Sequence, residues 1–271
     1  MEFATVVVIY NQFCGDSPTC QALRQGNPDI RVLIFDNSTK DMGNREYCLR
    51  QGWTYLGGTG NQGISKAYNA CIDLLKTQGF GGTVCLFDDD TAVAPAYFEE
   101  LRKARTAGAG RILVPLIYAG ERLLSPSLIR RNHSGRTFQT DREALAYRGG
   151  ELSAINSCMA LDMALFRDYR YDEHIFLDGI DHAFLMDMKR RGETITVFPY
   201  RCDHDFSGAS KSSKQAALTR FRIYAKDYRY ILRRNLWAYM ALVGKRALRL
   251  TAQHPSFVFA SVFMRNLFSK P

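Results

Sequence analysis

The sequence lacks a hydrophobic run long enough to cross a bilayer. A membrane-spanning helix needs about 20 mostly apolar residues, and the longest run here, residues 236–243, is much shorter. Residues 1–5 contain neither the basic region nor the cleavage site of a signal peptide. These absences argue against an integral membrane protein and predict a cytoplasmic location.

The sequence also lacks the paired cysteine spacing of a metal cluster or a disulfide framework. None of its seven cysteines forms a CxxC pair, the count is odd and the spacing is irregular. We therefore expect free thiols in a reducing compartment, several of them as small core residues.

Acidic residues are nearly missing from the C-terminal segment. From residue 211 onward the chain has 13 Lys and Arg residues but one acid, Asp227, giving +12, whereas the preceding residues carry −3. Aromatic residues, including Trp237 and Phe268, alternate with these basic residues. Basic amphipathic helices with aromatic side chains lie in membrane interfaces. The pattern predicts a helical tail that contacts a membrane peripherally; packing on the rest of the chain or in an oligomer is the alternative.

The first 120 residues alternate between strand and helix patterns. The composition, 46% hydrophobic and 23% charged, is that of a folded globular protein. The predicted strands cover residues 6–9, 32–35, 54–56, 83–87, 112–115, 155–161 and 194–198. The predicted helices cover residues 65–76, 96–107, 162–166 and 180–191, and a long one begins at 215. Residues 119–150 are expected to form loops or short strands. This order predicts an α/β fold with a mostly parallel sheet flanked by helices.

Two predicted strands end in an acid, at Asp36 and Asp88. Ligands of open α/β sheets bind outside the carboxyl ends of the strands. The adjacent carboxylates of Asp88, Asp89 and Asp90 repel one another unless a cation neutralises them, and hard oxygen ligands suit Mn²⁺ or Mg²⁺. A solvated acidic turn is the plainer reading, but the position after a buried strand favours a site. For Asp36 alone, a turn or helix cap remains the simpler interpretation.

Three further motifs are ambiguous by themselves. Glycine-rich residues 57–63 precede a helix and would let backbone amides approach phosphate or sugar, but they match no phosphate-loop or dinucleotide fingerprint. Asp178 or Asp181 could be a general base at a helix start, or simply a helix cap. His204 lies between two acids, as a metal ligand or an ordinary loop histidine would.

Taken in order, these motifs resemble the family 2 glycosyltransferases, which are inverting enzymes of the GT-A fold. The similarity is nearest to bacterial rhamnosyltransferases and galactofuranosyltransferases of surface-polysaccharide assembly. The matching segments are residues 6–11, 33–38, 61–63 with Ala67 and Asn69, 88–90, 156–159, 171–173 and 178–181, then His204 and residues 233–235.

The resemblance implies a Rossmann-like GT-A sheet and assigns roles to the residues that match. Asp36 would contact the nucleotide base, Asp88 would lie near the ribose, and Asp90 with His204 would ligate the divalent ion. The other residues expected on the donor side are Tyr10, Asn11, Asn61, Gly63 and Asp89.

On the acceptor side, the resemblance implies Asn156 and Asp178 as site residues and Asp181 as the catalytic base. Two departures leave Asp178 as an alternative base. Ile180 replaces the acid that usually precedes the base, and the helix continues without the common second acid.

The implied reaction moves a hexose, with rhamnose or galactofuranose favoured, from a UDP or dTDP sugar to a saccharide or lipid-linked saccharide in polysaccharide, O-antigen or capsule synthesis. Residues 1–210 would form the catalytic domain, with a donor half to about 118 and an acceptor half from 119, and residues 211–271 the tail. We expect no nucleic-acid partner, a place at the inner face of a bacterial plasma membrane, and a sequence compatible with an oligomer.

Two other classes of protein share some of these features. A sugar-phosphate nucleotidyltransferase would need a glycine-rich basic loop after the first strand, which residues 10–14 do not provide. A non-catalytic protein that binds polyanions or membranes would explain the tail but not the acids at two strand ends.

Overall fold

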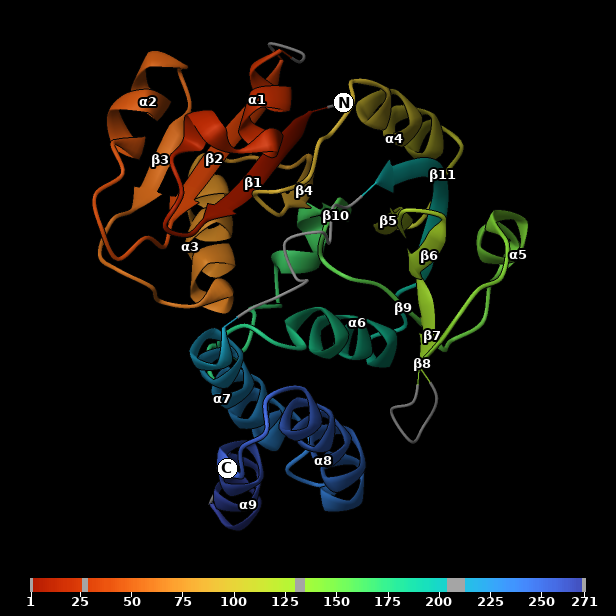
Figure 1. Ribbon diagram of the computed structural model, residues 1–271. Coiled ribbons are helices and arrows are strands. Elements are labelled where there is room, and N and C mark those ends of the chain that lie inside the picture. Colours follow the sequence, from red (N-terminus) through yellow and green to blue (C-terminus); the bar gives the residue numbers. More distant parts are fainter. Residues whose placement is uncertain (1, 26–28, 130–134, 204–212, 270–271) are drawn as a thin grey trace.

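A twisted central sheet with helices on both faces forms the body of the protein in the computed structural model (Figure 1). The structure describes residues 2–25, 29–129, 135–203 and 213–269. The main sheet has eight strands in the order β11-β5-β10-β4-β1-β2-β3, with β6 paired to β5. The predicted α/β class is therefore confirmed.

The first four strands of the sheet pair in parallel with one another. Strands β1 (Phe3–Ile9), β2 (Ile30–Asp36), β3 (Thr54–Gly57) and β4 (Thr83–Phe87) match the β-branched runs of the sequence. Strand β1 pairs with β2 on one side and β4 on the other, so their carboxyl ends meet at one edge. This register brings the residues after Ile9, Phe35 and Phe87 together.

Helices cover the two faces of the sheet with separate apolar cores. On one face, α3 (Ile64–Thr77) and α6 (Ile180–Arg190) pack on side chains such as Val6 and Leu33. On the other, α1 (Pro18–Arg24), α2 (Asn44–Arg50) and α4 (Ala96–Thr106) pack on Val7 and Ile34. All seven cysteines are buried and free of disulfides, as predicted.

The second half of the sheet departs from the parallel pattern. Strand β10 (Met159–Asp162) is antiparallel to both β4 and β5 (Ile112–Ala119), whereas β11 (Ile195–Asp203) is parallel to β5. The strand predicted over residues 155–161 begins late because Cys158 has a positive φ of 59° and the amide of Met159 turns back to Asn156 O. The helix predicted at 162–166 is a 3-10 turn, Met163–Phe166.

The polar segment after β5 forms short elements, as expected. Strand β6 (Arg122–Ser125) extends the main sheet, and β7 (Ser127–Ile129) pairs with β8 (Gly135–Thr137) and β9 (Leu152–Ser153) in a small second sheet. Helix α5 (Asp141–Ala146) begins at Thr140, whose hydroxyl accepts from the amide of Glu143. A further 3-10 turn, Cys14–Asp16, precedes α1.

Three C-terminal helices share a core of their own. Helices α7 (Lys214–Ile231), α8 (Leu236–Gln253) and α9 (Val258–Phe268) enclose buried side chains such as Phe221, Tyr239 and Phe259. Within the described residues, no helix is long and apolar enough to cross a membrane. The amino-terminal part of α7 reaches back toward the sheet edge and α6 (Figure 1).

Candidate active site

A cleft of about 710 Å³ opens at the carboxyl ends of β1 and β4. Five of the residues expected on the donor side line it, namely Tyr10, Asn61, Gly63, Asp88 and Asp89. The remaining walls come from Phe176 and Leu177, before α6, and from the first three turns of α7. Asn37, after β2, also lines it, so the cleft is built from six separate stretches of the chain.

The acidic turn after β4 is electrostatically strained. Burial, followed by the charges of Asp90 and Asp89, raises the pKa of Asp88 to about 7, although a hydrogen bond from Ser157 partly offsets this. Burial and Asp90 raise the pKa of Asp89 to about 6. Thr19 fixes the turn by donating to Asp88 O at 2.5 Å. A divalent cation would remove the repulsion, so the oxygen-rich turn fits Mn²⁺ or Mg²⁺.

The described residues do not complete a metal site by themselves. Among them, no group of three or more His, Cys, Asp or Glu side chains is placed to hold a metal ion. His204, the second expected metal ligand, lies outside the described residues. Asp90 is exposed at the end of the turn.

Asp36 and Asn11 hold loops at the base of the cleft. Asp36 is 3% exposed, and its carboxylate accepts from Ser38 N at 2.9 Å, Asn44 Nδ2 at 2.9 Å and Tyr55 Oη at 3.2 Å. Burial and the charge of Asp36 raise the pKa of Tyr55 to about 12. Asn11, with φ at 50°, donates its amide to Ser38 Oγ at 2.8 Å. Direct contact of Asp36 or Asn11 with a donor stays a prediction.

The glycine-rich segment is required for close packing at Gly63. This residue has a φ of 84°, and an added Cβ would lie 2.7 Å from Phe176 O. Its amide donates to Asn61 Oδ1 at 3.0 Å, and the next amide, of Ile64, donates to Phe176 O at 2.7 Å. The glycine thus joins the start of α3 to the loop before α6.

The two candidate bases at the start of α6 have different surroundings. Asp178 forms a two-pronged ion pair with Arg220 of α7, with Nη2 2.9 Å from Oδ1. Asp181, in the first turn of α6, accepts from His182 N at 2.7 Å, and its charge contributes to the raised pKa of Asp88. No ion pair of Asp181 is found in the described part of the chain. The geometry therefore favours Asp181 over Asp178 as a proton acceptor.

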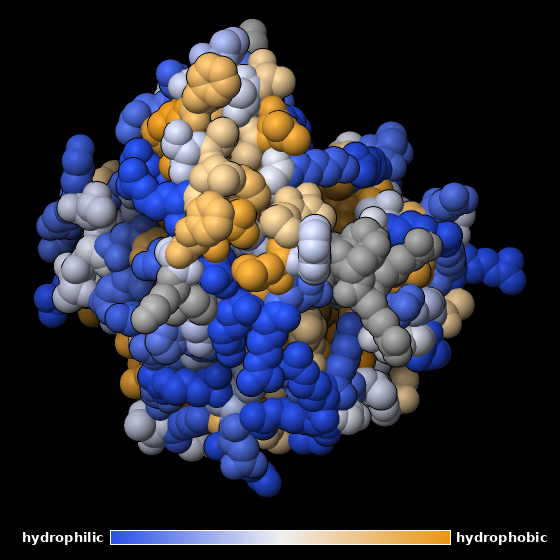
Figure 2. Space-filling view, turned by 90° about the horizontal axis from the view of Figure 1, so that it is seen from below, coloured by the Kyte–Doolittle hydropathy of each residue, from blue (hydrophilic) through white to orange (hydrophobic). Residues whose placement is uncertain are grey.

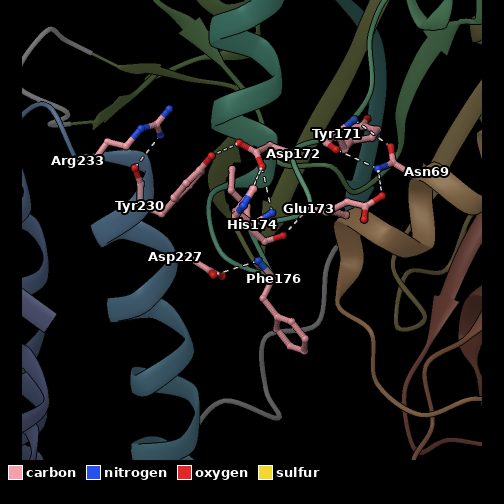
Figure 3. A network of polar contacts seen from close by, with 11 residues as sticks. Asn69, Tyr171, Asp172, Glu173, His174, Phe176, Asp227, Tyr230 and Arg233 are labelled. Carbon is pink, nitrogen blue, oxygen red and sulfur yellow. Dashed lines mark hydrogen bonds and ion pairs between the residues drawn. The ribbon is translucent and has the colours of Figure 1, made fainter. Parts of the chain in front are cut away.

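The loop between Tyr171 and Asp178 is held from both sides (Figure 3). Asn69 of α3 donates to Tyr171 O at 3.0 Å and accepts from Tyr171 N at 2.9 Å. From α7, the fully buried carboxylate of Asp227 accepts from the amides of Phe176 at 3.0 Å, and of Leu177 and Asp178 at 2.8 Å each. The acid of the basic tail is therefore a structural support of the site.

Sequence reasoning missed this contribution of α7. Its cleft-lining residues are Gln215, Ala216, Thr219, Arg220 and Ile223, preceded by Ser213. A signal was present in the sequence, because Asp227 is three residues after Tyr224 on the apolar stripe of a basic helix. An acid at such a position needs a buried partner.

Asn156, expected on the acceptor side, lies behind the acidic turn. It is 7% exposed, and its Oδ1 is buried without a hydrogen-bond partner among the described residues. The next residue, Ser157, contacts Thr91 at 3.0 Å between the two hydroxyls. Asn156 is thus adjacent in sequence to Ser157, which also hydrogen-bonds to Asp88, and its contact with an acceptor stays a prediction.

Comparison with known proteins gives the class of this protein. Residues 6–170 match the family described as Glycosyl transferase family 2. This match spans more than half of the chain, and the protein belongs to that family. No match was found among curated protein sequences.

Solved structures with the same fold are glycosyltransferases of the GT-A type. The protein is similar to S. aureus TarS, with a TM-score of 0.54 and 13% identity over 86% of this chain and 44% of TarS. It is also similar to GalNAc-T7 with UDP, GalNAc and Mn²⁺, with a TM-score of 0.61 and 15% identity over 85% of this chain and 50% of that one. The chain thus spans half or less of the length of these two relatives. The similarity extends to TarS 1–349 in complex with UDP-GlcNAc, with a TM-score of 0.51 and 12% identity over 98% and 89% of the two chains.

Proposed function

We propose that this protein is an inverting, metal-dependent glycosyltransferase that uses a nucleoside-diphosphate sugar. The observation that carries the proposal is the meeting of Asp88, Asp89 and Asn61 in one cleft, with Asp181 close enough to Asp88 to perturb its pKa. Family membership supports glycosyl transfer, and two similar structures were solved with UDP or a UDP sugar.

In the proposed reaction, Asp181 takes the proton of an acceptor hydroxyl. The hydroxyl oxygen then forms a bond to the anomeric carbon as the bond from that carbon to the diphosphate breaks, which inverts the configuration. General bases of this kind contribute about 10²- to 10⁴-fold to the rate. The start of α6 holds Asp181 in place, because Asp227 and Asn69 fix the preceding loop.

Asp90 and His204 are the proposed protein ligands of the Mn²⁺ or Mg²⁺ ion. Such an ion would act as a Lewis acid toward the departing diphosphate. The chain itself contributes Asp88 and Asp89, whose raised pKa values support the proposal that the turn favours a bound cation.

The proposed donor is a UDP or dTDP sugar, with rhamnose or galactofuranose ahead of other hexoses, and the proposed acceptor is a saccharide or lipid-linked saccharide. A panel of nucleotide sugars, each assayed for hydrolysis and transfer with Mn²⁺ and with EDTA, tests the activity. Metal-dependent release of UDP or dTDP from at least one donor is expected. Release from none of them, or equal release in EDTA, would contradict the proposal.

We also propose peripheral contact of the C-terminal helices with the inner face of a bacterial plasma membrane. Figure 2 views the molecule from the side of these helices and shows hydrophobic side chains gathered in a strip beside hydrophilic ones. Within the C-terminal helices and their connections, Trp237, Phe257 and Phe268 are 81%, 85% and 79% exposed, and the segment from residue 211 carries +12. Exposed aromatics on a basic surface suit an anionic lipid interface.

A further inference from the structure

Among the described residues that line the donor cleft, Arg220 is the only one with a cationic side chain. Its helix, α7, lines the same cleft as Asp88 and Asp89. The side chain is 45% exposed and bonds through both terminal nitrogens to Asp178, which is 13% exposed. A guanidinium group with five donors in a planar fork matches a phosphate as well as it matches a carboxylate.

The acidic residues of the cleft would disfavour a diphosphate unless a cation such as the Arg220 guanidinium were also present. Asp88 and Asp89, which line the same cleft, repel a nucleoside diphosphate, whose own charge is also negative. A single divalent ion cannot offset both the carboxylates and the diphosphate. A cation on the α7 wall would therefore favour diphosphate binding, and Arg220 occupies that wall.

A second arginine, Arg246, also acts on the charge of Asp178. Burial raises the pKa of Asp178, and the charge of Arg220, followed by that of Arg246 on α8, partly offsets this rise. The Arg246 guanidinium lies 4.0 Å from the ring centre of Tyr224, and its Nε is buried without a hydrogen-bond partner among the described residues. Departure of Arg220 would thus leave Asp178 near a positive charge that has an unused donor.

We propose that Arg220 binds the diphosphate of the donor and leaves Asp178 as it does so, with Arg246 remaining as the counter-charge of Asp178. This inference rests on the proposed use of a nucleoside-diphosphate sugar. It gives the C-terminal helices a direct part in donor binding. It also makes Asp178 a partner of donor recognition, distinct from the base Asp181.

Titration calorimetry of the full chain with UDP, dTDP and uridine in Mn²⁺ tests the proposal. Loss of a charge-assisted hydrogen bond in Arg220→Gln should weaken diphosphate binding about 10- to 100-fold. The affinity of Arg220→Gln for uridine, which has no phosphate, should stay within about twofold of the wild-type affinity. Arg220→Lys, which keeps the charge, should lose less affinity. The matched control is Arg222→Gln, an exposed arginine two residues along α7 that should leave both affinities unchanged.

Asp178→Asn separates diphosphate recognition from a purely structural ion pair. If Arg220 must leave Asp178 to bind phosphate, removing that charge should tighten UDP binding severalfold. Equal UDP affinity in wild type and Arg220→Gln would overturn the inference. So would equal loss of UDP and uridine, or weaker UDP binding in Asp178→Asn. Failure of the wild type to bind either diphosphate would instead contradict the proposed function itself.

Discussion

At the residue scale, the acidic side chains near the cleft differ in what surrounds them. Asp178 forms an ion pair with Arg220, and Asp36 is buried and accepts hydrogen bonds from Ser38, Asn44 and Tyr55. Among the described residues, Asp181 accepts a hydrogen bond from a backbone amide and forms no ion pair, while Asp88 has a carboxyl pKa of about 7. Because a base must be ionised but not locked in an ion pair, Asp181 is the best placed of the acids to take a proton.

Replacement of Asp181 by Asn should separate chemistry from donor binding. The amide cannot accept the acceptor proton, so turnover is expected to fall about 10²- to 10⁴-fold. UDP affinity, measured by calorimetry in Mn²⁺, should stay within about twofold because the donor cleft is lined by other residues. Normal turnover by Asp181→Asn would rule out this base, and a parallel loss in Asp178→Asn alone would move the role there.

The acidic turn should make the metal-free protein less stable as the pH rises. The folded-state pKa of Asp88, about 7, lies above its ordinary value of 3.8, so the folded state holds a proton that the unfolded state releases. The stabilising contribution of the neutral form is lost as pH rises through about 7. In urea unfolding with EDTA at pH 8, the free energy of unfolding of Asp88→Asn should be higher than that of wild type by on the order of 2 kcal/mol.

That advantage of Asp88→Asn should shrink as the pH is lowered from 7 toward 4. Wild type should also gain stability from added Mn²⁺ at pH 8, since a ligand that binds only the folded state shifts unfolding. An advantage that grows at low pH would show that the carboxylate is stabilised in its charged form.

Much of the donor side could be predicted from residues alone, because an acid directly after a buried strand must lie at the sheet edge. Asp88 and Asp89 were found in this way, Asn61 was predicted from the family resemblance, and all three line the cleft. Arg220 and Asp227 could not be assigned, since their roles depend on how α7 folds back over residues far away in sequence.

At the scale of elements, the loop before α6 is the link between the sheet and the C-terminal helices. It contacts α3 through Ile64 and α7 through Asp227. The long strands and helices were predictable because their periodic patterns are long. Helices α1 and α2 were missed, since each has seven residues and too few turns to show an apolar stripe.

Removal of the Asp227 carboxylate should loosen this link. Asp227→Ala leaves three partly buried amides of the loop without their acceptor, which should lower the free energy of unfolding by about 3 kcal/mol. Turnover should fall as well, because the loop leads directly into Asp181. Urea denaturation and a transfer assay measure the two effects.

Lys226→Ala is the matched control for Asp227. Lys226 is the adjacent residue of α7 and is exposed, so its removal should change stability by less than about 0.5 kcal/mol. If the two variants were equally stable, the three hydrogen bonds would not be holding the loop.

At the scale of the whole molecule, the basic segment has two faces with different tasks. Its inner face packs: Phe221 of α7 shares a core with Tyr239 and Phe259, and Arg229 ties α7 to the end of α9 through Asn266 O at 3.1 Å. Its outer face keeps Trp237 and other apolar side chains exposed. Deleting α8 and α9 would expose this core, so point substitutions test the outer face more cleanly than truncation.

Substitution of the exposed aromatics should weaken binding to anionic vesicles without unfolding the protein. Trp237, Phe257 and Phe268 changed together to Ala would lose apolar area available to the lipid interface, so binding should fall at least about 10-fold. Flotation with phosphatidylglycerol vesicles measures this, and binding of wild type should decline with added salt because basic residues supply part of the attraction. Leu49→Ala is the control, since Leu49 is 67% exposed on α2, outside the C-terminal helices. Equal flotation of wild type and the triple variant, or equal loss with Leu49→Ala, would show that these aromatics form no membrane contact and would leave an oligomer interface as the use of this face.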